Sequence, residues 1–248
     1  MKWRTKISTH SDGDLYLRGH KLIDLIGSAT FSQAIFLAIA GRMPTKKEEK
    51  MLDVILISGI EHGVEAPSAF SARVVASTGN QMNAALAAGV LAVGDWHGGA
   101  IEAAMRLLER PEVPAELVRE SLARDVRLPG YGHKIYKTED PRTKAIFVAA
   151  QKLGFGKKYL ARARAIEREL AKQSGKTLPL NIDGAIAAVL LEFGLDARLG
   201  KAFFILARMP GMIAHVYEEM RDEKPYRRFD EEDVEYIGPE LKKKKIKK

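Results

Sequence analysis

The sequence contains no cysteine, and this one absence excludes several classes of protein. It rules out a disulfide framework, a thiolate metal site and a cysteine nucleophile. No apolar run reaches the roughly 18 residues that a membrane-spanning helix needs, and the first residues lack the apolar core of a signal peptide. We therefore expect a soluble, cytoplasmic protein without a membrane partner.

The short motifs of common enzyme classes are also absent. The sequence has no Walker motif, no His-Glu-x-x-His pair and no Gly-x-Ser-x-Gly turn. No group of histidines or carboxylates has the spacing of metal ligands. We expect no metal site.

Positive charge is plentiful but unevenly placed. Six of the eight net charges lie in the lysine-rich stretch 241–248, which leaves little excess on the rest of the chain. Such a run is typical of a disordered, solvated tail. We expect that tail and no nucleic-acid partner.

The apolar residues recur with helical spacing almost throughout, so the expected fold class is all-α. Residues 1–240 suit a single domain, with a large helical part and a smaller one around 105–205. Thr45 and Glu48 form a capping-box pattern, and Pro210 should end or kink the last helix. The best strand candidate is "LYLRG" near residue 17. Further helices are expected near 31–40, 68–78, 80–93, 97–110, 114–125, 140–153, 156–174, 181–194 and 196–221.

Three polar residues lie where apolar helices begin or next to glycines that give the backbone more conformational freedom. His97 precedes a helix, whose dipole would lower its pKa and leave a neutral donor for a developing enolate oxygen. His133 follows two glycines that let a ligand approach the backbone. Asp183 heads a very apolar helix as an N-cap or as a desolvated base with a raised pKa. Each also has a plain structural interpretation: a polar helix start, a turn and a cap.

Several cationic residues are candidates for binding an anion. Arg208 lies between apolar runs, where a lone arginine needs a partner or an anionic ligand. His215 is expected to be a packed core histidine. The other candidates are His62, Arg142, Arg227 and Arg228.

Four segments occur in an order that resembles the citrate synthase superfamily. They are "EHGVEAPSAFSARVVAST", "HGGAIEAA", "PGYGHKIYKTEDPR" and "NIDGAIAAVL", and the similarity extends over most of residues 15–230. This resemblance implies a compact multi-helix fold and a homodimer. It also implies a reaction that joins or cleaves a carbon–carbon bond beside a coenzyme A thioester.

The resemblance assigns three catalytic residues. For cleavage, His133 takes the hydroxyl proton of citryl-CoA, His97 stabilises the enolate of acetyl-CoA, and Asp183 protonates its carbon. His62, Arg142, Arg208 and Arg227 would hold the carboxylates of oxaloacetate, with Arg227 reaching across a dimer. The implied contacts to coenzyme A, a substrate and not a permanently bound cofactor, are Gly130, Tyr131, Gly132 and Lys176.

Within the superfamily, "GDWHGGA" and "KPYRRFDEEDVEYIGPE" resemble the citryl-CoA lyase module at the C-terminus of ATP-citrate lyase. That module often lacks a histidine where His97 stands. A lyase would use the product of a separate citryl-CoA synthetase. The alternatives are a compact citrate synthase, a related condensing enzyme such as 2-methylcitrate synthase, and a catalytically silent CoA-binding or assembly subunit.

Overall fold

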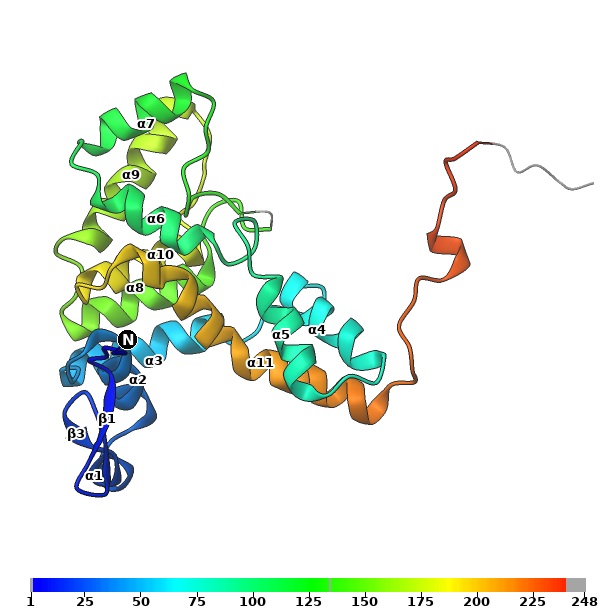
Figure 1. The fold of residues 1–248 in the computed structure, drawn as a ribbon. Helices are drawn as coiled ribbons and strands as arrows, with labels where there is room; N and C mark the ends of the chain where they lie inside the picture. Colours follow the sequence, from blue (N-terminus) through cyan, green and yellow to red (C-terminus); the bar gives the residue numbers. More distant parts are fainter. Residues whose placement is uncertain (1, 134, 240–248) are drawn as a thin grey trace, which may run out of the picture.

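The structure is a computed structural model that describes residues 2–133 and 135–239, and helices dominate it (Figure 1). The expected all-α class is confirmed, with one small sheet added. The α-helices are α1 (Leu22–Ser28), α2 (Phe31–Ala40), α3 (Lys46–Gly59), α4 (Pro67–Ser77), α5 (Met82–Leu91), α6 (Ala100–Glu109), α7 (Pro114–Ala123), α8 (Pro141–Leu153), α9 (Tyr159–Ser174), α10 (Ile182–Glu192) and α11 (Gly200–Asp222). Two short 3₁₀ helices, η1 (Ala197–Leu199) and η2 (Glu231–Asp233), precede and follow α11.

Local sequence explains where several helices begin. Thr45 and Glu48 form the expected capping box at the start of α3, and Thr30 and Gln33 form a second one at α2. Asn181 caps α10 by accepting the backbone N–H groups of residues 183 and 184. Each of these starts is therefore fixed by side chains that satisfy otherwise unpaired amides.

The small sheet is only partly anticipated by the sequence. The strands β1 (Ser8–Ser11), β2 (Asp14–Leu17) and β3 (His20–Lys21) pair antiparallel in that order. Only β2 corresponds to the strand expected near residue 17. The strands β1 and β3 are short and polar, so they carry no alternating apolar pattern from which to predict them.

The core has two parts, which α11 spans. In the larger part, α10 packs against α6, α8 and α9, and every residue from Gly184 to Leu191 is buried. In the smaller part, α4 and α5 pack against each other and against α11. Because α11 also contacts α3 and α6, it brings the two parts together, as its long diagonal path shows (Figure 1).

Two expectations about α11 need correction. Pro210 does not end the helix, which continues to Asp222. The stretch Ala197–Asp222 is also long and apolar enough to cross a membrane by length and composition, which the sequence alone did not suggest. It contains the buried charged residues Arg208 and Glu219 and packs against α3, α4, α5 and α6, while about a third (33%) of its most apolar window is buried.

The C-terminal residues after α11 form an extended arm that leads away from the helices (Figure 1). The predicted lysine tail, 241–248, lies outside the described residues. The expected smaller helical part around 105–205 stays a prediction.

Candidate active site

His97 lies in a tight turn immediately before α6. Its N–H and that of Gly99 both donate to the Gly94 carbonyl, at 2.9 and 3.0 Å. Gly98 has φ of +80°, and a Cβ there would strike the ring of Phe204. The same ring meets His97 edge-on at 5.4 Å between centroids. The turn therefore holds the imidazole against α11.

The proton of His97 is positioned by Ser68 on α4. Nε2 of His97 accepts the Ser68 N–H at 3.3 Å and lies 2.9 Å from Ser68 Oγ. A neutral ring that accepts at Nε2 carries its proton on Nδ1. Burial, with Arg208 and His62 nearby, lowers the pKa of His97. The lowered pKa expected from the sequence is confirmed, with burial as its largest cause.

His133 is held by the backbone of its own loop. Its Nδ1 accepts the N–H groups of Ile135 and Tyr136, each at 3.0 Å. This favours the neutral tautomer with the proton on Nε2. Burial, opposed by Asp140 and reinforced by Arg142, lowers the pKa of His133. The ring therefore presents a donor, which changes the role expected of it as a proton acceptor.

The glycines before His133 allow its loop to lie on the start of α10. Gly130 has φ of +87°, and a Cβ there would strike Gly184 of α10. Asn181 donates from Nδ2 to the Gly132 carbonyl and from its backbone to the Gly130 carbonyl, both at 3.0 Å. The Tyr131 hydroxyl donates to Ala163 of α9, so only the backbone of Tyr131 is free to face a ligand.

Asp183 follows the cap of α10 and is not itself the cap. Asn181 Oδ1 accepts the backbone N–H groups of Asp183 and Gly184 at 3.1 and 3.2 Å. No hydrogen bond joins the Asp183 carboxyl to another described residue. Burial raises its pKa to about 6, against the opposing charges of Arg142 and Arg208. The interpretation of Asp183 as an N-cap is wrong, and the desolvated acid remains.

Arg142 is fixed by Asp140, which lies two residues before it in the segment "PGYGHKIYKTEDPR". Asp140 is fully buried, caps α8 and binds the Arg142 side chain through Nε at 3.1 Å and Nη2 at 2.9 Å. Burial would raise the pKa of Asp140, but the hydrogen bonds from Arg142 outweigh it and lower the pKa. Arg142 also approaches Nε2 of His133 at 3.3 Å and Nδ1 of His62 at 3.4 Å.

Arg208 is buried on α11 without a carboxylate partner among the described residues. Its Nε donates to the Gly59 carbonyl at 2.9 Å, and its guanidinium lies 5.1 Å from the centre of the Phe204 ring. Its Nη1 has no hydrogen-bond partner. Burial lowers the pKa of Arg208. A buried guanidinium with an unused donor is costly unless an anion binds it.

Contacts and mutual electrostatic influence bring most of the expected residues together. We call them the ligand cluster: His62, His97, His133, Arg142, Asp183 and Arg208. Its members lie on α11, in the loops before α4, α6 and α8, and in the first turns of α8 and α10. It combines hydrogen-bond donors, two guanidinium groups and one carboxyl with a raised pKa, which suits an anionic substrate and proton transfer to or from carbon.

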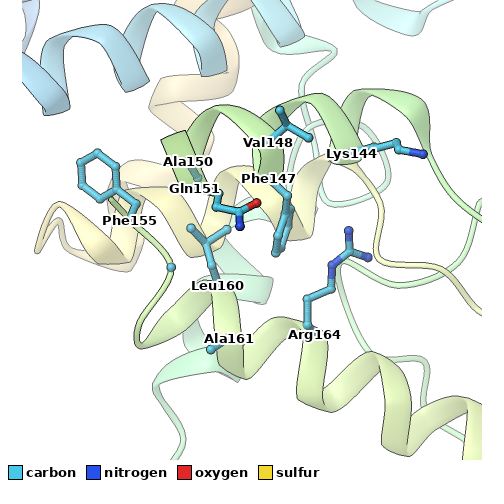
Figure 2. A pocket seen from close by; sticks show the side chains of 10 residues that line it. Lys144, Phe147, Val148, Ala150, Gln151, Phe155, Leu160, Ala161 and Arg164 are labelled. Atoms are coloured by element: carbon cyan, nitrogen blue, oxygen red, sulfur yellow. The ribbon is translucent and has the colours of Figure 1, made fainter. Parts of the chain in front are cut away.

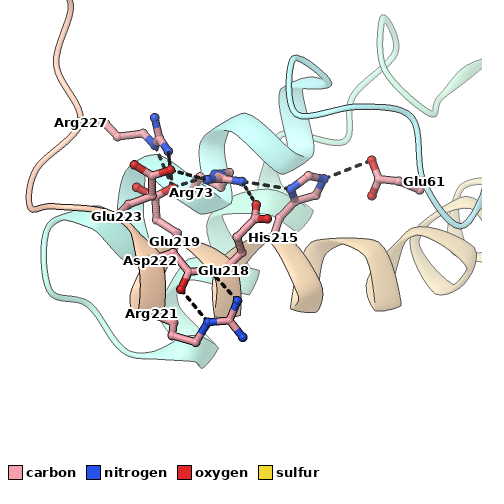
Figure 3. Close-up of polar contacts among 9 residues, drawn as sticks. All are labelled: Glu61, Arg73, His215, Glu218, Glu219, Arg221, Asp222, Glu223 and Arg227. Atoms are coloured by element: carbon pink, nitrogen blue, oxygen red, sulfur yellow. Dashed lines mark hydrogen bonds and ion pairs between the residues drawn. The ribbon is translucent and has the colours of Figure 1, made fainter.

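Arg227 and Lys176 do not join the ligand cluster within this chain. Arg227 pairs with Glu219 at 2.7 Å and with Glu223 at 3.4 Å (Figure 3). Lys176 is exposed, with its backbone N–H on Ser174 Oγ. Both residues lie in segments that follow a helix, Arg227 after α11 and Lys176 after α9. The sequence does not predict the path of such segments through space.

A cavity of about 390 Å³ lies between α8 and α9, apart from the ligand cluster (Figure 2). Apolar side chains including Phe147 and Leu160 line it, with Lys144 and Arg164 beside them. Both cations pair with Glu139, at 3.2 and 3.9 Å. This cavity contains none of the residues expected to act on a substrate.

Known proteins share this arrangement of helices. A family model described as the C-terminal domain of citrate synthase matches residues 43–228. The structure of a citryl-CoA lyase from Hydrogenobacter thermophilus superposes with a TM-score of 0.94 at 46% identity, covering 97% of this chain and 96% of that one.

Curated proteins of the same kind are more distant and longer. The citrate/2-methylcitrate synthase of Bacillus subtilis is 33% identical over 225 residues, which are 87% of this chain and 58% of that protein. The putative citrate synthase 2 of Mycobacterium bovis is 32% identical over 204 residues, which are 79% of this chain and 53% of that protein. The chain spans about half the length of the curated relatives it matches.

Proposed function

Because this chain belongs to the citrate synthase family, we propose that it is a citryl-CoA lyase, which cleaves citryl-CoA to acetyl-CoA and oxaloacetate. The resemblance seen in the sequence is thereby confirmed at the level of the family. The similarity to a citryl-CoA lyase over nearly the whole of both chains supports the choice within it. The structural observation that carries the proposal is the ligand cluster, in which Arg142 lies 3.3 Å from His133 and 3.4 Å from His62 and the buried Nη1 of Arg208 lacks a partner.

The two arginines would bind the carboxylates of the oxaloacetate half of the substrate. Arg208 offers a buried Nη1 that lacks a partner, and a carboxylate would satisfy it. Arg142 is held rigid by Asp140 and turned toward His62 and His133. A ligand oxygen placed between Arg142 and His133 would accept from both of these donors, which cannot bind one another in the favoured tautomer of His133.

The carbon–carbon cleavage would proceed through the alkoxide of citryl-CoA. The hydroxyl loses its proton to solvent, and His133 Nε2–H together with Arg142 stabilises the resulting oxyanion. The oxyanion collapses to the carbonyl of oxaloacetate, and the electron pair of the broken bond passes into the thioester as an enolate. His97, with its proton on Nδ1, donates to the enolate oxygen.

Asp183 completes the reaction as a general acid. Its carboxyl proton moves to the enolate carbon and gives the methyl group of acetyl-CoA, and the carboxylate then regains a proton from solvent. No net proton is gained or lost. In the reverse direction the same group, ionised, removes a proton from acetyl-CoA.

Coenzyme A enters this proposal as part of the substrate and not as a resident cofactor, and no metal is part of it. Gly130 packs against α10, whereas a Cβ at Gly132 would meet only Leu178, so the proposed approach of the pantetheine chain to this loop is at Gly132. Tyr131 contributes through its backbone. Lys176 remains proposed for a coenzyme A phosphate, supported only by its exposure and its charge.

We further propose a homodimer acting in the cytoplasm on the product of a separate citryl-CoA synthetase. Exposed apolar side chains on α11 and on the C-terminal arm support association; they are Ile213, Tyr217, Met220, Tyr226 and Phe229. Arg227 would reach a partner's ligand cluster only after leaving Glu219. Sedimentation at micromolar concentration tests the dimer, and a purely monomeric species would contradict it.

The deciding experiment supplies citryl-CoA and follows two products. Oxaloacetate is trapped by malate dehydrogenase with NADH, and free thiol is measured with a colorimetric reagent. A lyase releases oxaloacetate and acetyl-CoA faster than thiol. Thiol release from acetyl-CoA plus oxaloacetate, with citrate accumulating, would make the protein a compact synthase, a reading favoured by its curated relatives. Neither activity, with acetyl-CoA still bound, would favour another acyl-CoA or a silent subunit.

A further inference from the structure

Three side chains beyond the ligand cluster form a chain of contacts (Figure 3). This chain of contacts ends at the backbone of His62. Glu61 Oε1 accepts the backbone N–H groups of His62 and Gly63, both at 2.7 Å. Nε2 of His215, on α11, lies 3.2 Å from the same oxygen. Nη1 of Arg73, on α4, lies 3.3 Å from Nδ1 of His215. We call Arg73, His215 and Glu61 the relay.

The chemistry of arginine gives the relay a direction. A guanidinium can only donate, so Nδ1 of His215 must accept from Arg73. A neutral His215 then carries its proton on Nε2 and donates it to Glu61. Arg73 is buried and is itself held by Glu219 at 2.7 Å and Glu218 at 2.5 Å. The tautomer of His215 is therefore set by a side chain that has little freedom to move.

The shape of α11 supports the same arrangement independently of these hydrogen bonds. A Cβ at Gly211 would collide with the Ile60 carbonyl oxygen and with the Glu61 carboxylate. Only glycine at this position lets the loop before α4 lie so close to the helix. The loop that carries His62 is thus seated on α11 by shape as well as by hydrogen bonds.

We propose that Arg73 and His215 are positioning residues that set the backbone of His62 through Glu61, and so set the affinity for the dicarboxylate. The proposal rests on the proposed function, because it concerns the same ligand cluster. His215 was expected to be a packed core histidine and not a ligand, and the structure adds that both of its ring nitrogens have polar partners. His62 faces Arg142 at 3.4 Å, so a shift of the loop alters the space in which a carboxylate would bind.

Paired substitutions at His215 test whether donation from its Nε2 to Glu61 is what positions the loop. In His215→Gln the side-chain amide reaches the position of Nε2 and can donate to Glu61, whereas in His215→Asn it reaches only the position of Nδ1. We expect His215→Asn to weaken oxaloacetate binding about tenfold, the effect of one lost hydrogen bond to a charged group. His215→Gln should recover most of that loss, and acetyl-CoA binding should change less than about twofold in both. Calorimetric titration of each ligand measures this.

Two further variants serve as a second perturbation and a control. Gly211→Ala keeps every hydrogen-bonding group but pushes the loop from α11, so it should weaken oxaloacetate binding in the same direction. His20→Asn changes an exposed histidine on β3 and should have no effect.

Hydrogen exchange of the peptide spanning 60–66 provides a readout that does not depend on catalysis. Exchange there should rise in His215→Asn and Gly211→Ala, stay near that of the unmodified protein in His215→Gln, and change little elsewhere. The proposal is overturned if His215→Gln behaves as His215→Asn does, or if exchange in 60–66 stays unchanged in His215→Asn. If the unmodified protein neither cleaves citryl-CoA nor binds oxaloacetate, the proposed function fails, while the exchange result still decides the relay.

Discussion

Arg142 and His133 bring two donor nitrogens within 3.3 Å of each other, Nη2 to Nε2, although neither can accept from the other in the favoured tautomer. Asp140 fixes the arginine and two backbone amides fix the histidine, so the approach is built into the fold. An anionic oxygen near both would turn this unfavourable pair into two charge-assisted or polar hydrogen bonds. The pair therefore marks where a substrate oxygen should lie.

Asp183→Asn should keep the fold and the binding of coenzyme A and reduce turnover by about 10²–10⁴, the usual contribution of a general acid or base. The fold survives because Asn181, and not Asp183, caps α10. Steady-state kinetics with citryl-CoA measure the loss, and Asp125→Asn in the exposed loop after α7 is the control. Near-normal turnover would remove Asp183 from the mechanism.

Cleavage should depend on pH through the protonated form of Asp183. With a pKa of about 6 in the free protein, the acid form is abundant below pH 6 and falls about tenfold per unit above it. The value of kcat/KM for cleavage should decline with rising pH, and that for condensation should rise through the same range. A cleavage profile that is flat between pH 5 and 8 would contradict this assignment.

The same raised pKa should make Asp183 cost stability once it ionises. The folded-state pKa lies above the ordinary value of 3.8, so the folded protein binds the proton more tightly than the unfolded chain. Stability is therefore lost as pH rises from about 4 to about 6, by up to about 3 kcal/mol. Asp183→Asn should raise the melting temperature at pH 7 but not at pH 4. An equal rise in melting temperature at pH 4 and pH 7 would show that the ionisation of Asp183 does not cause the loss of stability.

Arg208→Leu should raise KM for oxaloacetate far more than KM for acetyl-CoA, because it removes charge-assisted pairing to one ligand only. Arg106→Leu, which removes an exposed arginine paired with Glu102, is the matched control and should change neither. Equal effects of Arg208→Leu on both substrates, or a loss of thermal stability alone, would make Arg208 a structural residue.

Removing residues 241–248 should leave the kinetics unchanged and abolish most of any affinity for nucleic acid, since six of the eight net charges leave with them. Turnover and DNA binding at two salt concentrations measure both effects. A large fall in turnover would indicate instead that the segment takes part in closing the ligand cluster.

The sequence by itself determined the helical class, most helix positions and the family, and it indicated every member of the ligand cluster as a candidate. Helical periodicity, caps and glycine-bounded loops are local properties, so they can be predicted from neighbouring residues. The ordered motifs around His97, His133 and Asp183 likewise allowed the candidate chemistry to be predicted from the sequence.

Only the tertiary structure decided how these residues are held. That Ser68 orients His97, that Asp140 fixes Arg142, and that Asn181 frees Asp183 from capping all depend on helix starts and loops meeting in space. Pro210 within α11 shows the same limit, because packing along the whole helix outweighs one missing backbone donor. Arg227 lies with Glu219, and His215 between Arg73 and Glu61, because side-chain pairing is settled by distances that sequence spacing does not contain.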